Sequence, residues 1–188
     1  MIETVKRKLR HLALLDAIIE QEWEYRYYSF NSSWSESEEM ASLRDGSGGE
    51  WFFLFEGNNL AFKCTSPVDG LVQDFEGLKL KVPEHFHSFL NEPAFNMSQG
   101  SCIWYVQEKI WVRLGISIKD LPDPEAVLKM TTSDYCNFVE SYFDRKIDES
   151  LIESVLEGKY TTEIAKQINP EIDIELLAND LAEIGECT

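Results

Sequence analysis

The stretch WFFLFEGNNLAFKC, residues 51–64, decides the fold class. Its two apolar runs, Trp51–Phe55 and Leu60–Cys64, are separated by the short sequence EGNN at residues 56–59. Two apolar runs around a short Gly/Asn loop are typical of a β-hairpin. We therefore expect two neighbouring antiparallel strands in this part of the chain.

A second pair of apolar runs predicts a second hairpin. Ser101–Gln107 and Ile110–Leu114 are rich in the β-branched and aromatic residues that favour strands. Side chains on paired strands meet across the sheet, so Trp104 and Trp111 should lie near each other. Together the two hairpins predict an antiparallel sheet of four or more strands.

Residues 2–24 predict one long N-terminal helix. Apolar residues recur there at spacings of three and four, which places them on one helical face: Val5, Leu9, Leu12, Leu15, Ile19 and Trp23. His11 follows the basic residues of Lys6–Arg10 and is expected to face solvent. The apolar pattern is interrupted by Asp16 and Glu20 and ends without a small-residue cleavage site, so the segment does not resemble a signal peptide.

The last third of the chain predicts helices. Asp148, Thr161 and Asp173 are residue types that cap helix N-termini. We expect four helices here, over Asp134–Phe143, Glu149–Leu156, Thr162–Ile168 and Ile174–Ile184. The chain is thus an α+β protein, with a sheet domain over residues 1–121 and a helical C-terminal region over residues 122–188, packed on the first as one unit.

Two shorter helices are expected between these elements. Ser33 or Ser35 could cap a helix over Glu36–Leu43, because acidic residues then occupy its first turn. A proline at an early position opens a second helix over Pro83–Leu90. The expected order around residue 44 is therefore helix, turn, strand.

Composition narrows the classes of partner. The 188 residues include 34 Asp and Glu against 17 Lys and Arg, which gives a formal net charge of −17. Phosphate contacts require cations, so we expect neither nucleic acid nor an anionic membrane as a partner. No apolar run approaches the roughly 18 residues of a membrane span. A basic protein remains a suitable partner, because the field of the chain would steer its approach.

The charge is unevenly distributed along the chain. Residues 131–188 hold 14 Asp and Glu against 4 Lys and Arg, whereas the N-terminal helix opens on a basic cluster. This asymmetry has two interpretations. The two ends pair with each other, or an acidic face is left for a partner.

The segment Arg44–Gly49, RDGSGG, is the first candidate site. It is not a phosphate loop, because Gly-Lys-Ser/Thr is absent. The guanidinium of Arg44 could bind a carboxylate or phosphate with two parallel hydrogen bonds, beside the backbone amides around Ser47. Asp45 could then serve as a base. Alternatively, Arg44 and Asp45 only stabilise the turn itself.

Aromatic residues give a second set of candidates. Trp34 and Trp51 flank the same segment, and Trp and Tyr concentrate at binding hot spots. Both are also ordinary core residues. The site candidates are therefore Trp34, Arg44, Asp45, Ser47 and Trp51.

Nothing in the sequence indicates a catalytic residue, a cofactor or a metal. His85 and His87 are two residues apart, so on a helix they cannot share a metal ion. The four cysteines are scattered singly, without zinc-ligand spacing. They are interpreted as reduced thiols of a cytoplasmic protein.

Several segments resemble an uncharacterised family of bacterial proteins of similar length. The resemblance runs from about Trp23 to Gly185, and MASLRDGSG and FLNEPAF are its most specific parts. It implies a bacterial cytoplasmic protein. A weaker similarity links VPEHFHSFL to SUKH-type immunity proteins, which bind and neutralise toxins; that superfamily often continues with Asn-Gly-Gly, where this chain has Asn91-Glu92-Pro93.

Two functional hypotheses follow. The first is a non-enzymatic protein-binding module, immunity-like, that presents an acidic and aromatic surface to a basic partner. The second is a small-molecule-binding protein or enzyme that uses the Arg44–Gly49 turn to hold an anionic ligand. The sequence leaves the oligomeric state and the sheet topology open.

Overall fold

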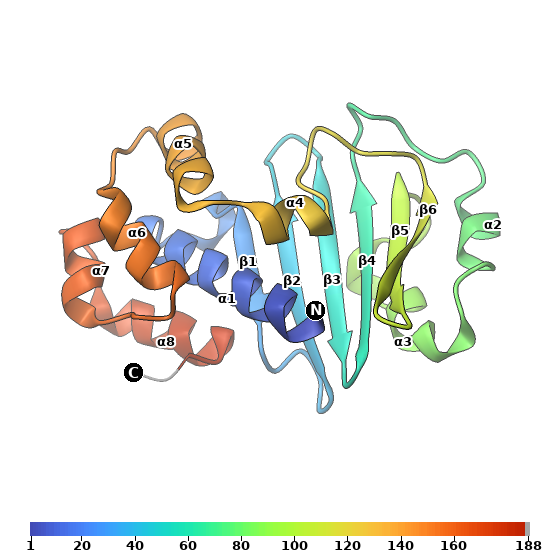
Figure 1. Cartoon of the computed structure of the whole chain (residues 1–188), viewed down its shortest axis with the longest axis horizontal. Coiled ribbons are helices and arrows are strands. Elements are labelled where there is room, and N and C mark those ends of the chain that lie inside the picture. The colour runs from blue at the N-terminus through green and yellow to red at the C-terminus, as the bar shows by residue number, and fades with distance from the viewer. Residues whose placement is uncertain (187–188) are drawn as a thin grey trace.

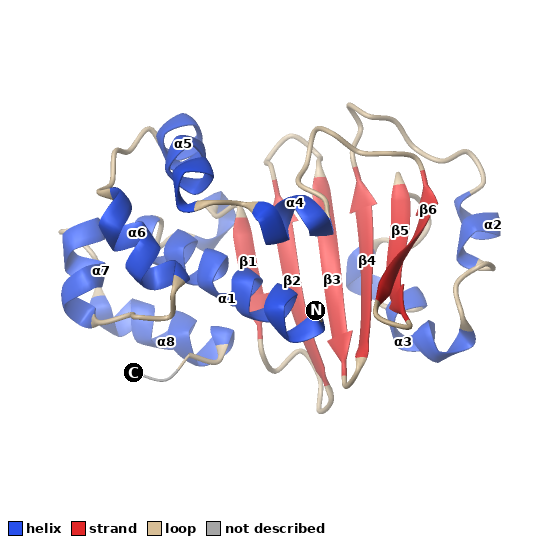
Figure 2. Ribbon diagram, in the orientation of Figure 1, coloured by secondary structure: helices blue, strands red, loops and turns tan. Residues whose placement is uncertain are grey.

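The protein is an α+β fold built on one six-stranded antiparallel sheet. The structure, a computed structural model, describes residues 1–186. The strands pair in chain order, each with the next. They are β1 (Tyr28–Asn31), β2 (Glu38–Arg44), β3 (Glu50–Glu56), β4 (Asn59–Thr65), β5 (Cys102–Gln107) and β6 (Ile110–Gly115), shown in Figures 1 and 2.

Both predicted hairpins are confirmed. β3 and β4 pair around a two-residue turn, with Glu56 opposite Asn59. β5 and β6 pair in the same way, and the rings of Trp104 and Trp111 lie 6.0 Å apart. The sheet thus contains the predicted four strands and two more.

The helices gather mainly at the two ends of the chain. The first, α1 (Ile2–Ile19), is shorter than predicted and is followed by a 3-10 turn, η1 (Trp23–Tyr25). The C-terminal helices are α4 (Pro124–Lys129), α5 (Thr132–Phe143), α6 (Glu149–Leu156), α7 (Thr162–Ile168) and α8 (Ile174–Ile184). The last three have the predicted bounds. Asp148, Thr161 and Asp173 cap them through hydrogen bonds to backbone amides.

The connection between β4 and β5 is partly helical. It holds α2 (Phe75–Lys79), the 3-10 turn η2 (Glu84–Phe86), α3 (His87–Leu90) and the 3-10 turn η3 (Pro93–Phe95). The helix predicted over Pro83–Leu90 is therefore present as a 3-10 turn that continues into one α-helical turn.

The helix predicted over Glu36–Leu43 is wrong, because these residues enter strand β2. The strand is hydrogen-bonded on both sides, with Ser42 opposite Ser29 of β1 and opposite Phe52 of β3. Tertiary pairing overrides a weak local helix signal here. The segment around residue 44 is consequently strand, turn, strand.

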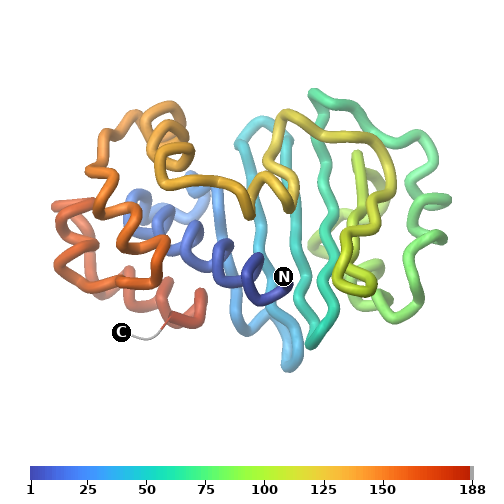
Figure 3. The backbone as a smooth tube through the Cα atoms, in the orientation of Figure 1, coloured from blue at the N-terminus to red at the C-terminus, as the bar shows by residue number. Residues whose placement is uncertain are grey.

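The two faces of the sheet have separate cores. One face packs on α1 and α4, while α5–α8 gather beyond the β1 edge of the sheet, where α6, α7 and α8 contact α1 (Figure 3). The other packs on the β4–β5 connection, from Phe75 to Met97. Central strands covered on both faces need apolar residues at nearly every position, as in WFFLF. At β1 and β2 the second face is instead polar, with Ser29, Asn31, Ser42 and Arg44.

Two buried polar residues of α1 connect this helix to its neighbours, Asp16 to the sheet and to α5, and His11 to α6. Asp16 is fully buried and accepts hydrogen bonds from the amides of Tyr27 and Tyr28 and from the Tyr135 hydroxyl. His11 does not face solvent as predicted. It is 6% exposed, and its Nδ1 lies 2.8 Å from the Leu156 carbonyl oxygen, because α6 packs over it.

No helix among residues 1–186 is long and apolar enough to span a bilayer.

Candidate functional site

The β2–β3 turn is held together by Asp45. Its Oδ1 accepts hydrogen bonds from the amides of Ser47, at 2.7 Å, and Gly49, at 2.8 Å. Gly46 and Gly48 adopt positive φ values of 73° and 100°, which favour glycine. The carboxylate of Asp45 is therefore used by the turn itself, and Ser47 lies exposed at its tip.

Arg44 points away from this turn. Its guanidinium lies over the ring of Trp23, at 5.0 Å from the centroid, and over the ring of Phe52, at 5.7 Å. Arg44 is exposed, so these cation–π contacts favour one orientation of its side chain without burying it. Trp34 lies in the same place, so the structure brings together two of the residues singled out by sequence.

These side chains line a groove of about 200 Å³ on the polar part of the sheet. We call it the Arg44 groove, and its lining includes Trp23, Ser29, Trp34, Ser42, Arg44 and Phe52. Side chains alternate between faces along a strand, so Ser42, Arg44 and Phe52 share one face through the register of β2 and β3. Trp23 enters from η1 and closes one side.

The aromatic wall of the groove is a continuous stack. The rings of Phe52 and Phe95 lie 4.6 Å apart and nearly parallel, and Trp34 stacks on Phe95 at 6.3 Å. The indole nitrogen of Trp34 donates to Glu92 at 3.1 Å. The wall is therefore fixed before any ligand arrives.

Arg44 has no acidic partner within the described chain. No carboxylate oxygen of residues 1–186 lies within 4.0 Å of its guanidinium. Glu50 sits directly opposite on β3 but lies 3.7 Å from the ammonium of Lys63 instead. Lys63 is fully buried, and burial lowers the pKa of its ammonium group.

Trp51 lies away from the groove, on the opposite face of the sheet. It is fully buried among Tyr28, Phe53 and Phe62. Its indole nitrogen has no hydrogen-bond partner in the described part of the chain. In this structure Trp51 is therefore a core residue.

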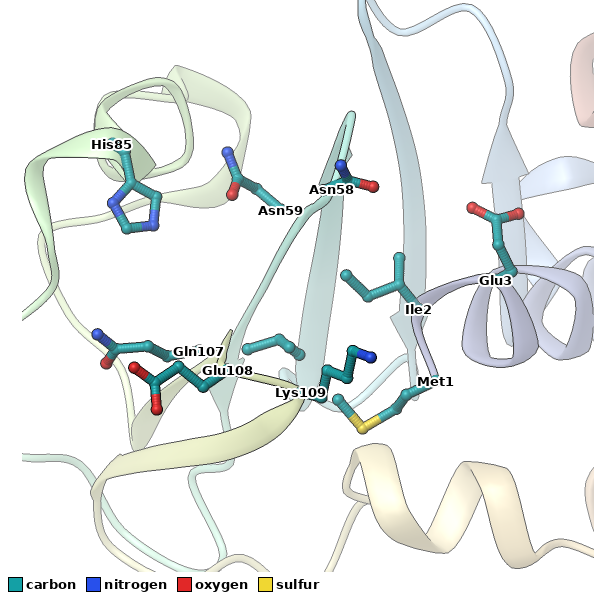
Figure 4. Close-up of a pocket in the computed structure, with 10 residues that line it drawn as sticks. Met1, Ile2, Glu3, Asn58, Asn59, His85, Gln107, Glu108 and Lys109 are labelled. Atoms are coloured by element: carbon teal, nitrogen blue, oxygen red, sulfur yellow. The ribbon is translucent and has the colours of Figure 1, made fainter.

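A second and larger cavity, of about 720 Å³, lies at the end of the sheet. The two hairpin turns, the start of α1 and η2 surround it (Figure 4). Its polar lining includes Glu3, Asn59, His85, Gln107, Glu108 and Lys109. Sequence reasoning missed this cavity, because these residues belong to separate turns without any motif. Their mixture of amides and isolated charges points to no particular reaction.

The acidic residues of the C-terminal helices are largely left at the surface. The direct ion pairs of the α1 cations are made elsewhere: Lys6 and Arg10 pair with Glu39 of β2, and Lys8 donates to the Met130 carbonyl. Lys6, Arg7 and Arg10 nevertheless line a pocket that Glu157 and Glu186 also line, without an ion pair to either. Arg26 does cross to the helices, where it binds Asp180 with two hydrogen bonds. Pairing between the two ends of the chain therefore neutralises little of the acidic third.

Comparison of the chain with models of protein families, with curated proteins and with solved structures finds no match. Within residues 1–186, no group of three His, Cys, Asp or Glu side chains is arranged to hold a metal ion.

Proposed function

We propose that the protein is a non-enzymatic protein-binding module, immunity-like, that presents an acidic surface to a basic partner. The observation that carries this proposal is that Lys6 and Arg10 pair with Glu39 and Lys8 binds the Met130 carbonyl, which leaves most of the described carboxylates of the acidic helices without a direct ion pair. A surface of one sign steers an oppositely charged partner during encounter. The free thiols Cys64 and Cys102, both buried, fit a reducing cytoplasmic location.

Helix α6 offers the most regular part of this surface. Glu149, Glu153 and Glu157 are spaced by four residues, so they form one stripe along the helix, and all three are exposed. Glu157 pairs with Lys159, whereas Glu149 and Glu153 form no ion pair within the described chain. The stripe suits a partner with cations at a similar spacing.

The test is affinity capture from the native host with matched variants. The double variant Glu149→Gln/Glu153→Gln removes two charges from the stripe. The control Glu84→Gln/Glu108→Gln removes two exposed charges on the other side of the molecule. We expect the wild type and the control to retain one basic protein at low salt and the stripe variant to lose it. Capture of no protein, or equal capture by all three, would contradict the proposal.

A second candidate function is the binding of a small anionic ligand by Arg44. The observation that favours it is a guanidinium that lies over two aromatic rings and has no acidic partner within the described residues. The site would be the Arg44 groove, because Asp45 and Ser47 belong to the turn. Arg44→Gln should then abolish anion binding while the melting temperature stays nearly unchanged. A large loss of stability would show that Arg44 is structural.

A further inference from the structure

We propose that the Arg44 groove binds a small monocarboxylate that carries a single aromatic ring. This inference rests on the second candidate function and adds the class of ligand. It follows from the charge, the aromatic wall and the size of the groove.

Three of the other arginines have a carboxylate partner: Arg10 pairs with Glu39, Arg26 with Asp180 and Arg113 with Glu125. Within residues 1–186, Arg7 and Arg145 form no ion pair either, but neither lies over an aromatic ring, and Arg145 donates to the Ile19 carbonyl. Arg113 is the closest match, since its guanidinium also lies over an indole ring, that of Trp104, at 4.6 Å.

The guanidinium of Arg113 therefore contacts both an aromatic ring and a carboxylate. The guanidinium of Arg44 contacts two aromatic rings and, within the described residues, no carboxylate. The chain carries twice as many acidic as basic residues. An exposed arginine that lies over two aromatic rings and has no carboxylate partner within the described residues can accept a carboxylate from outside. The planar fork of the guanidinium matches the two carboxylate oxygens.

The aromatic wall supplies the apolar half of the site. Trp23 is 52% exposed, a large aromatic surface for a folded protein to leave in water. It faces a groove whose other wall includes Trp34, held by its stack on Phe95 and its bond to Glu92. Arg44 lies over the Trp23 ring and Phe95 stacks on Trp34, so an aromatic ring in the groove would pack on the parts of these indoles that stay uncovered and gain area burial there.

The dimensions and the rim limit the ligand further. The groove of about 200 Å³ is smaller than the roughly 300–1,000 Å³ of sites for drug-sized ligands, so one ring fits and a nucleotide does not. Glu183 lies at the rim, held by Asn31 at 3.1 Å. Its charge opposes any anion in the groove, and opposes a dianion more strongly than a monocarboxylate. The hydroxyls of Ser29 and Ser42 also line the groove and are donors for a carboxylate.

The experiment is a titration of the full chain with four probes: benzoate, benzamide, acetate and inorganic phosphate. The readout is the indole N–H signals of Trp23 and Trp34 in proton–nitrogen NMR spectra, with Trp104 as the internal reference. We expect benzoate to shift the first two signals with a dissociation constant on the order of 1 mM, a modest ligand efficiency for its size. Benzamide, which lacks the charge, and acetate, which lacks the ring, should each bind at least about 10-fold more weakly.

The variants locate the effect. Arg44→Gln should weaken benzoate at least about 10-fold. The matched control Arg113→Gln removes a guanidinium from another indole and should change nothing at the groove. Arg44→Lys keeps the positive charge but loses the planar guanidinium, so it should bind benzoate with intermediate affinity. This variant replaces Arg44→Gln in the test if Arg44→Gln fails to fold. Glu183→Gln should improve the binding of phosphate.

The outcomes are separable. Equal binding of benzoate and acetate through Arg44 would overturn the aromatic class and leave the anion site intact. Equal binding of benzoate and benzamide, or no effect of Arg44→Gln, would overturn the carboxylate contact. If no anion moves either indole signal up to tens of millimolar, the second candidate function fails together with this inference.

Discussion

Asp16→Asn should stabilise the protein at pH 8 and leave its stability nearly unchanged at pH 4. Burial raises the pKa of the Asp16 carboxyl from 3.8 to about 7, against the opposing effect of the Tyr135 hydroxyl and the two backbone amides. Between these two values the unfolded chain releases a proton that the folded chain keeps. Unfolding therefore becomes easier as the pH rises through this window, and the loss is complete above pH 7.

The size of the effect follows from the width of the window. Each unit of pKa difference is worth about 1.4 kcal/mol, so the wild type should lose about 4 kcal/mol from this carboxyl between pH 4 and pH 8. That is a large part of the 5–15 kcal/mol that stabilises a typical domain. Asparagine matches the protonated carboxyl, because its oxygen can accept from the two amides and its NH2 can donate to Tyr135.

The measurement is urea unfolding of both proteins from pH 4 to pH 8. Other carboxylates titrate alike in the two chains, so the difference between the two free energies of unfolding isolates Asp16. We expect the variant to gain about 4 kcal/mol relative to the wild type across the range. A flat difference would mean an ordinary pKa for Asp16. A wild type that gains relative to the variant as the pH rises would mean that the three donors outweigh burial and hold the carboxyl ionised.

Three further predictions concern the groove, the turn and the core. Lys63→Met should free Glu50 to pair with Arg44, so benzoate binding should fall at least about 10-fold in the same NMR titration; unchanged binding would contradict the account. Asp45→Ala should lower the free energy of unfolding by about 1–3 kcal/mol, because the amides of Ser47 and Gly49 lose their acceptor, and should leave benzoate binding intact. Loss of binding would show that the β2–β3 turn is part of the binding site. Trp51→Phe should cost less than about 2 kcal/mol, because it removes an indole N–H without a partner; a loss above about 3 kcal/mol would contradict this.

The C-terminal helices could be predicted from the sequence because their signals are local. Asp148, Thr161 and Asp173 accept hydrogen bonds from amides two or three residues ahead, so each helix start is specified within one turn of chain. The hairpins have equally local turns. Residues 36–43 predict a helix because their serines and glutamates resemble a helix start, whereas the pairing of β2 with β1 and β3 depends on residues elsewhere in the chain.

The candidate site was predicted only in part, for a reason of register. Arg44 and Trp34 were singled out by residue type, and both line the groove. Trp51 and Phe52 are adjacent in sequence and equally apolar, and only the pairing of β3 with β2 decides that Phe52 faces Arg44 while Trp51 enters the opposite core. A helix over residues 36–43 would not pair with β3. The alternation of side chains between the two faces of the sheet then gives no information about the face on which Arg44 lies.

Lys63 explains why Arg44 is left free. A fully buried ammonium group is costly to a core, and burial lowers its pKa accordingly. Its partner is Glu50, the residue that strand register places directly opposite Arg44. Without Lys63, Arg44 and Glu50 would form the cross-strand ion pair usual for opposite charges in a sheet. The ammonium of Lys63 also donates to the Thr65 hydroxyl at 2.5 Å, so its ion pair with Glu50 is one of two polar contacts, and Lys63→Met tests whether that pair keeps Glu50 from Arg44.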